Sequence, residues 1–257
     1  MSRLDDDAVT FTELVAEGAA APTEGWDFSW FEGRAIEERP PWGYARLMAG
    51  RMAGATAALD VETGGGEVLA TVMRRPPLLV ATESWPANVA LARDRLRPLG
   101  AHVVAVADRP TLPFAAASFD LVVSRHPVVV LWAEIARVLR PGGTYLSQQI
   151  GAGTNLELTD FMMGPQPPNA SRGPGPTRAA AEAAGLEVQD LRACALRVEF
   201  YDVAAVVCFL RKVRWTVPDF TPDAYLDRLR VMHELIRRDG SFVSTAQRLL
   251  VVADRPG

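Results

Sequence analysis

Hydrophobic and polar positions divide the middle of the chain into short apolar runs separated by amphipathic stretches. Helical patterns lie between the runs, most clearly at 86–99 and 131–139. Short apolar runs that alternate with helices are typical of a parallel sheet covered by helices on both faces. The region is therefore predicted to form an α/β core, with strands at 57–61, 78–82, 102–107, 119–124 and 144–150.

The flanking regions add elements on both sides of this core. Helices are predicted over 11–21 and 44–53, around an aromatic segment and a proline pair. After Gly151, the pattern predicts a short helix that ends at Gly185, and Asp202 is a candidate N-cap for a helix up to 212. The remaining predicted elements are strands at 186–198 and 244–253 and a helix over 221–238.

A glycine-rich turn follows the first apolar run directly, as Glu62-Thr63-Gly64-Gly65-Gly66. Glycine lets the backbone approach a ligand closely, and a helix beginning behind such a turn offers unpaired N–H groups. The pattern is typical of nucleotide sites, although a tight strand–helix turn without a ligand gives the same residues. A dinucleotide site would need a third small residue where Leu69 stands, which counts against NAD.

Acidic residues follow the next two apolar runs. Glu83 ends the run 78–82 and is placed to accept hydrogen bonds from both ribose hydroxyls; the alternative is an ordinary surface glutamate. Asp108 follows the next run, where a carboxylate can accept the exocyclic amine of adenine. The apolar Leu112-Pro113-Phe114 segment beyond it can enclose the ring.

Five motifs in this order resemble the class I S-adenosylmethionine-dependent methyltransferases. They are Leu-Asp-x-x-x-Gly-x-Gly from Leu59, the acidic Glu83, Asp-x-x-x-Leu-Pro-Phe from Asp108, Ser-Phe-Asp-Leu-Val from Ser118 and Arg-Val-Leu-Arg-Pro-Gly-Gly from Arg137. The Thr-Gly-Gly-Gly-Glu turn is similar to that of one bacterial subgroup. The sequence departs from the family at Glu62, where the family usually has glycine. A carboxylate there could reach the ammonium of the methionine moiety of the cofactor or could crowd it, and we favour the first interpretation.

The resemblance implies a fold, a domain division and a cofactor. The expected fold is a Rossmann-like seven-stranded sheet, mostly parallel with one antiparallel strand and with helices on both faces. Residues 1–55 would form a helical, aromatic lid segment, and 56–257 the methyltransferase domain, with a helical insert at 200–240. The implied cofactor is S-adenosyl-L-methionine, bound by ten residues: Asp60, Glu62, Thr63, Gly64, Gly66, Glu83, Ser84, Asp108, Arg109 and Ser124.

Methyl transfer needs an aligned acceptor and exclusion of water, and a base only when the acceptor must lose a proton. His126, at the end of the run 119–124, is the candidate catalytic base; the alternative is a packed loop histidine. Alternation along a strand places only one of Gln148 and Gln149 on a given side, where it can orient an acceptor. Further candidates near the ligands are Arg34, Trp42, Tyr44, Asn155 and the aromatic cluster Trp26, Phe28, Trp30 and Phe31, which forms either a substrate wall or a packed N-terminal arm.

Composition narrows the possible partners. The 257 residues carry 27 basic and 31 acidic side chains, a net charge of -4. No basic cluster suggests nucleic acid, no apolar stretch is long enough for a membrane span, and Cys194 and Cys208 lack metal-ligand spacing. We expect a cytoplasmic monomer or homodimer with a small-molecule acceptor and no metal. The competing functions are an S-adenosylmethionine-binding protein that does not methylate, with a structural or sensor role, and an NAD-dependent oxidoreductase.

Overall fold

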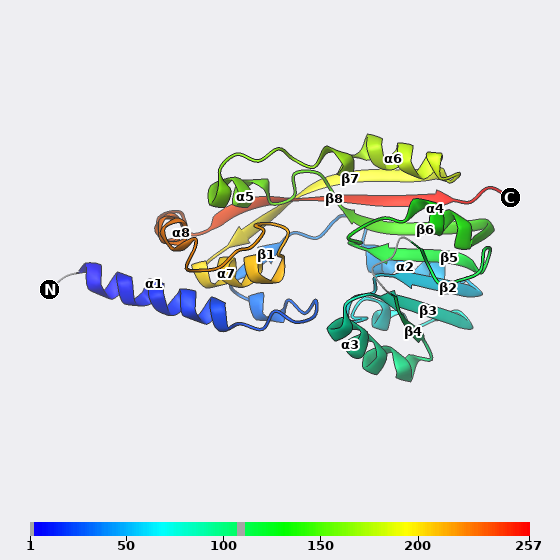
Figure 1. Cartoon of the computed structure of the whole chain (residues 1–257), viewed down its shortest axis with the longest axis horizontal. Helices are drawn as coiled ribbons and strands as arrows, with labels where there is room; N and C mark the ends of the chain where they lie inside the picture. The colour runs from blue at the N-terminus through cyan, green and yellow to red at the C-terminus, as the bar shows by residue number, and fades with distance from the viewer. Residues whose placement is uncertain (1–2, 107–110) are drawn as a thin grey trace. The chain divides into compact units, whose positions relative to one another are not determined.

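The computed structural model describes residues 3–106 and 111–257, the segment 3–10 by its backbone alone. The strands within this part of the chain follow the hydrogen-bonded order β1-β7-β8-β6-β5-β2-β3-β4 (Figure 1). Contacts divide the chain into two compact units, which are described separately. Unit 1 comprises Met1–Glu38, Gly153–Pro168 and Ala195–Ala246, and unit 2 comprises Arg39–Ala152, Asn169–Cys194 and Gln247–Gly257.

Unit 2 contains the parallel strands that the apolar runs predict. β2 (Ala57–Val61) lies between β3 (Leu78–Glu83) and β5 (Phe119–Arg125), and is parallel to both. β4 (His102–Ala105) pairs in parallel with β3, and β6 (Leu139–Ile150) with β5. The final strand, β8 (Phe242–Asp254), pairs antiparallel with β6 from Thr144 to Ile150. Because parallel strands end at one edge, the turns after β2, β3 and β5 come together.

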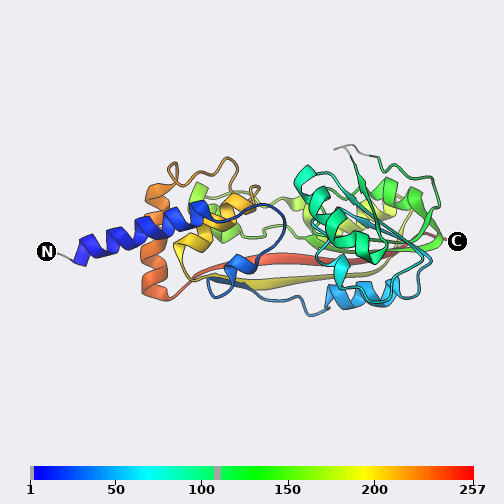
Figure 2. The same cartoon turned by 90° about the horizontal axis from the view of Figure 1, so that it is seen from below.

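Side chains alternate between two hydrophobic clusters, one on each face of this sheet. Ala58 faces α2 (Tyr44–Met52) and α3 (Pro86–Leu96), while the next residue, Leu59, faces α4 (Trp132–Val138) and α6 (Pro174–Ala183). Each strand is therefore apolar on both sides, which explains why the sequence shows continuous apolar runs rather than alternation. Figure 2 shows α3 beside β4, with which it makes contact.

Unit 1 is built largely from helices. α1 (Arg3–Ala20) packs against α7 (Val203–Lys212), which also contacts α8 (Leu226–Asp239) (Figures 1 and 2). Asp202 caps α7, as predicted, because its Oδ1 accepts a hydrogen bond from the Ala205 amide at 2.7 Å. Helix α5 (Leu156–Met163) also belongs to this unit, and β1 (Ala35–Glu37) pairs antiparallel with the end of β7 (Glu187–Phe200).

Three sequence predictions differ from the fold. Eight strands are present in the described residues, with three antiparallel pairs, where seven strands with one antiparallel strand were expected. The additional strand is β1, whose three residues are too few to be recognised by pattern. The helix expected behind the glycine turn is only one 3-10 turn, η2 (Leu69–Thr71), before Pro76 and Pro77 end the segment. Helix α8 begins at Leu226, later than predicted, and α5 was not predicted.

The other short helical turns connect longer elements. They are η1 (Ser29–Phe31), η3 (Arg97–Leu99) and η4 (Ala170–Arg172). None of the helices in the described residues combines the length and apolar character required to cross a bilayer.

Candidate functional site

The end of β2 carries a buried carboxylate, Asp60. Asp60 is 6% exposed, and its Oδ2 accepts a hydrogen bond from Thr63 Oγ1 at 2.7 Å. Burial raises the pKa of Asp60 to about 7, the Thr63 hydrogen bond opposes this rise, and the nearby charge of Glu83 adds to it. Burial therefore disfavours the charged form of Asp60, and a cation placed beside it would favour that form.

Glu83 at the end of β3 is fixed by three backbone amides. Its Oε2 accepts from the Gly64 amide at 2.8 Å, and its Oε1 accepts from Ser84 and Trp85 at 2.9 Å each. These bonds join the glycine turn to the end of the neighbouring strand and set the direction of the carboxylate. The predicted residues Asp60, Thr63, Gly64, Glu83 and Ser84 thus come together at one edge of unit 2.

The glycines of the turn serve the backbone and the packing. Gly64 has φ +65° and Gly66 φ +79°, in the left-handed region that glycine adopts without strain. A Cβ on Gly66 would meet the Leu96 side chain of α3 at 2.9–3.2 Å. Gly66 therefore permits close approach of α3 to the turn, and this packing role is sufficient to require glycine there.

Glu62 connects the glycine turn to the loop after β5. Its φ is +57°, which is unfavourable for a residue with a side chain and agrees with glycine being usual at this place. Its Oε2 accepts a hydrogen bond from the Val128 amide at 2.6 Å. The predicted contact of Glu62 with the ammonium of a bound cofactor would compete with this bond.

Ser124 lies in a buried polar network between β5 and β6. Its Oγ is 2.8 Å from the Tyr145 hydroxyl and 2.9 Å from Ser147 Oγ, and the Tyr44 hydroxyl donates to its carbonyl at 3.0 Å. Burial raises the pKa of Tyr44 well above its usual value, and Asp60 raises it further. Both side chains are thus engaged inside unit 2, where Tyr44 holds α2 against the end of β5.

His126 is held by a chain of hydrogen bonds from Trp42. Trp42 Nε1 can only donate, and it lies 2.8 Å from Gln148 Oε1. The other end of this amide, Gln148 Nε2, is 2.9 Å from His126 Nε2. Nε2 must accept, so the ring proton of His126 is assigned to Nδ1.

This arrangement affects the proposed role of His126 as a base. Burial lowers the pKa of His126 well below its usual value, and the charges of Arg125 and Arg248 lower it further. The ring is neutral at pH 7, but its unprotonated nitrogen faces Gln148. Proton abstraction by Nε2 would require that hydrogen bond to open.

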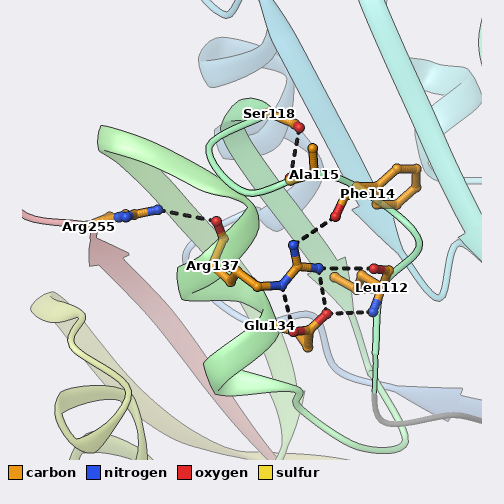
Figure 3. Close-up of polar contacts among 7 residues, drawn as sticks. All are labelled: Leu112, Phe114, Ala115, Ser118, Glu134, Arg137 and Arg255. Atoms are coloured by element: carbon orange, nitrogen blue, oxygen red, sulfur yellow. Dashed lines mark hydrogen bonds and ion pairs between the residues drawn. The ribbon is translucent and has the colours of Figure 1, made fainter.

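The predicted adenine side of the site is described only in part. Asp108 and Arg109 lie outside the described residues. The Leu112–Phe114 segment that follows is fastened to α4 by Arg137, which donates to the carbonyls of Phe114 at 2.7 Å and Leu112 at 3.0 Å (Figure 3). Glu134 pairs with Arg137 and accepts from the Leu112 amide, both at 2.7 Å (Figure 3). Arg137, the first arginine of the Arg-Val-Leu-Arg-Pro-Gly-Gly motif, thus positions this apolar segment.

The aromatic candidates of the N-terminal region have partners within unit 1. Trp26 packs on Trp215 and Phe31 on Phe209, with ring centroids 5.6 Å and 6.5 Å apart. This packing favours the interpretation of an N-terminal arm over that of a substrate wall. The prediction that residues 1–55 act as a lid stays a prediction.

Two other polar candidates also lie within unit 1. Arg34 pairs with Glu17 at 2.6 Å and with Asp202 at 3.5 Å. The backbone N–H of Asn155 donates to the Thr245 carbonyl at 2.7 Å, whereas its side-chain Oδ1 is buried without a hydrogen-bond partner. The Arg34 side chain therefore has structural partners inside this unit, and the Asn155 side-chain oxygen does not.

Trp85 was not recognised from the sequence. Its amide helps to hold Glu83, and its ring is 43% exposed directly after the candidate ribose carboxylate. The signal in the sequence was a tryptophan two residues after Glu83 and directly before Pro86, where α3 begins.

Comparison with known proteins agrees with this geometry. Residues 59–147 match the family model described as "Methyltransferase domain". No match was found among curated proteins. A candidate methyltransferase of Bacillus halodurans is 19% identical, with a TM-score of 0.61 over 84% of this chain and 99% of that protein.

Two further solved structures match nearly the whole chain. A candidate sarcosine dimethylglycine methyltransferase of Galdieria sulphuraria is 14% identical, with a TM-score of 0.53 and 98% of each chain covered. The [4+2]-cyclase SpnF is 18% identical, with a TM-score of 0.51 over 99% of this chain and 95% of that one. These likenesses establish the fold. The family match over residues 59–147 confirms the prediction of a methyltransferase enzyme.

Proposed function

We propose that the protein binds S-adenosylmethionine at the turn after β2 and transfers its methyl group to a small molecule. The observation that carries this proposal is the arrangement of Glu83, whose two carboxylate oxygens are oriented by amides from Gly64, Ser84 and Trp85. A carboxylate oxygen can accept more than one hydrogen bond, so Glu83 keeps capacity for the two ribose hydroxyls.

The residues present fit the cofactor in charge as well. S-adenosylmethionine is cationic at its sulfonium and ammonium groups, and Asp60 is a buried carboxylate whose pKa is raised to about 7. Such a cation would stabilise the ionised form of Asp60. The cofactor supplies an electrophilic methyl group when it is bound.

The protein's own residues would orient the reactants. Glu83 and Asp60 would hold the cofactor against the strand ends, and Glu62 fixes the loop 127–130 beside the same turn. Alignment and exclusion of water are the main requirements of this chemistry. A nucleophile already unprotonated at neutral pH suits the site best, because the unprotonated nitrogen of His126 is engaged with Gln148.

Transfer of a labelled methyl group tests this proposal. The protein is incubated with methyl-labelled S-adenosylmethionine and a panel of small amines, phenols, thiols and carboxylic acids. We expect label in an acceptor together with an equal amount of S-adenosylhomocysteine. Cofactor binding without transfer to any acceptor would contradict the methylating role.

That outcome would favour the second candidate function, a cofactor-binding protein that does not methylate. Two observations support it. The fold is shared with a protein described as a cyclase, and the candidate base of this chain has its unprotonated nitrogen in a hydrogen bond. The assay separates the two candidates because only a methyltransferase consumes the cofactor.

A further inference from the structure

A cavity of about 330 Å³ lies at the carboxyl ends of β5 and β6, entirely within unit 2. Its volume falls within the range of small-molecule pockets. Its walls come from the loop after β5, the end of β6, η4 and the first turns of α6. The lining residues are Pro127, Val128, Val129, Val130, Trp132, Gln149, Ile150, Asn169, Ser171, Arg172, Pro176, Thr177 and Ala180.

The character of these walls is apolar and cationic. Valine, isoleucine, proline and tryptophan side chains form the apolar half of the lining, polar side chains form the other half, and no lining residue carries a carboxylate. Val128 and Val129 are 62% and 58% exposed, which is unusual for residues beside a cavity. A ligand with an apolar body would cover part of this exposed surface.

Gln149 presents a polar group to the cavity. The residue is 6% exposed, and its Nε2 is buried without a hydrogen-bond partner. The side chain is close enough to the Tyr145 hydroxyl to lower the pKa of that group, but the amide nitrogen does not meet this oxygen in hydrogen-bonding geometry. Nε2 has no exposed surface, so the amide must turn toward the cavity to meet a ligand oxygen. Because a buried donor without a partner is costly, that new contact would be stabilised.

Arg172 supplies a positive charge to the same cavity. Its Nη2 donates to the Val128 carbonyl at 3.3 Å, and among the described residues no carboxylate pairs with it. The guanidinium has five donors in total, so it can bind both oxygens of an acid while keeping that bond. The beginning of α6 at Pro174, with its positive dipole end, lies beside the same wall.

We propose that this cavity binds a small organic acid, with its apolar body against Trp132 and the valines and its acidic oxygens at Arg172 and Gln149. This acid would be the methyl acceptor, an assignment that rests on the proposed function. Binding of the acid in the cavity does not depend on that function. The loop that forms the cavity wall is held at Val128 from both sides, by Glu62 at the amide and Arg172 at the carbonyl. The cavity is therefore adjacent to the candidate cofactor turn through one shared residue.

Binding of a matched pair of probes tests the proposal. Phenylacetate and its neutral amide, phenylacetamide, have the same apolar body and differ in charge. Calorimetry with the full chain should show phenylacetate bound at least about tenfold more tightly. Arg172→Gln should remove this preference, whereas Arg178→Gln should keep it, because Arg178 lies on the exposed side of α6 and pairs with Glu182.

A second variant separates recognition from folding. Gln149→Leu removes a buried donor that has no partner, so the free energy of unfolding should not fall, while phenylacetate affinity should. Equal binding of the two probes, no binding of phenylacetate at millimolar concentration, or unchanged affinity in Arg172→Gln would overturn the proposal. A parallel titration with S-adenosylmethionine keeps the tests distinct: cofactor binding without acid binding refutes the cavity proposal alone, and the reverse refutes the proposed function alone.

Discussion

Two carboxylates at the end of β2, Asp60 and Glu62, make different contacts. Asp60 is buried beside Thr63 and Glu83, whereas Glu62 turns toward the loop after β5 and holds the Val128 amide. The sequence predicted both as cofactor contacts, because a motif gives the residue type and its place on a strand. It contained no information about the Val128 partner, which is 66 residues away.

At this scale, stability should depend on pH through Asp60. Burial raises the pKa of Asp60 to about 7 in the folded chain, against 3.8 for an aspartate in water. As pH rises through this interval, the unfolded chain loses the proton before the folded chain does, so the free energy of unfolding falls by up to about 4 kcal/mol. Urea unfolding of wild type and Asp60→Asn at pH 5 and pH 8 should show about 3 kcal/mol of this fall in the wild type alone. Parallel pH dependence in the two proteins would show that Asp60 is not responsible.

The Glu62 side chain should restrict the loop after β5 through its bond to the Val128 amide, although the backbone of Glu62 is strained. Glu62→Gly relieves the positive φ, worth about 1–2 kcal/mol, but leaves the Val128 amide without its acceptor. We expect little change in the free energy of unfolding and much faster hydrogen exchange at Val128. Glu62→Gln retains an acceptor oxygen and should preserve the protection. Slow exchange in Glu62→Gly would rule out this role.

The observed bounds of a helix or strand agree with the sequence prediction where the contacts that stabilise it are local. The runs at 57–61 and 119–124 became β2 and β5 almost without shift, because both faces of these strands are covered. The helix expected after the glycine turn failed because Pro76 and Pro77 leave too little chain before β3. β1 could not be recognised, since its only reason to be extended is its pairing with β7, far along the chain.

Packing of α1 against α7 depends on one helical glycine. A Cβ on Gly18 would lie 2.5 Å from the Ala204 carbonyl oxygen and 2.9 Å from Val207 Cβ. Gly18→Ala should therefore lower the free energy of unfolding of unit 1 by about 1–3 kcal/mol. Gly50 in α2 is the matched control, with no atom within 4 Å of such a Cβ. Gly50→Ala should raise stability by about 1 kcal/mol through helix propensity. Chemical denaturation of both variants measures these changes. A Gly18→Ala protein as stable as wild type would contradict this packing.

At the scale of the whole molecule, the sequence predicted the sheet of unit 2 but not the division into two units. Unit 1 collects three segments, Met1–Glu38, Gly153–Pro168 and Ala195–Ala246, which are distant in the sequence. Contacts between such segments leave no periodic signal in any one of them. The candidate cofactor residues were easier to predict, because they follow directly after the parallel strands of one unit and so meet at one edge.

Glu83 and its neighbours are proposed to form a binding site for S-adenosylmethionine. Isothermal titration of the folded chain with this cofactor measures that binding. We expect one site per chain. Glu83→Gln, which keeps an acceptor oxygen for the Ser84 and Trp85 amides but loses the acceptor of the Gly64 amide, should weaken binding by about tenfold or more. Asp94→Ala, which removes an exposed carboxylate from α3, should leave the affinity unchanged. Absence of binding at millimolar cofactor, or equal affinity in wild type and Glu83→Gln, would contradict the account.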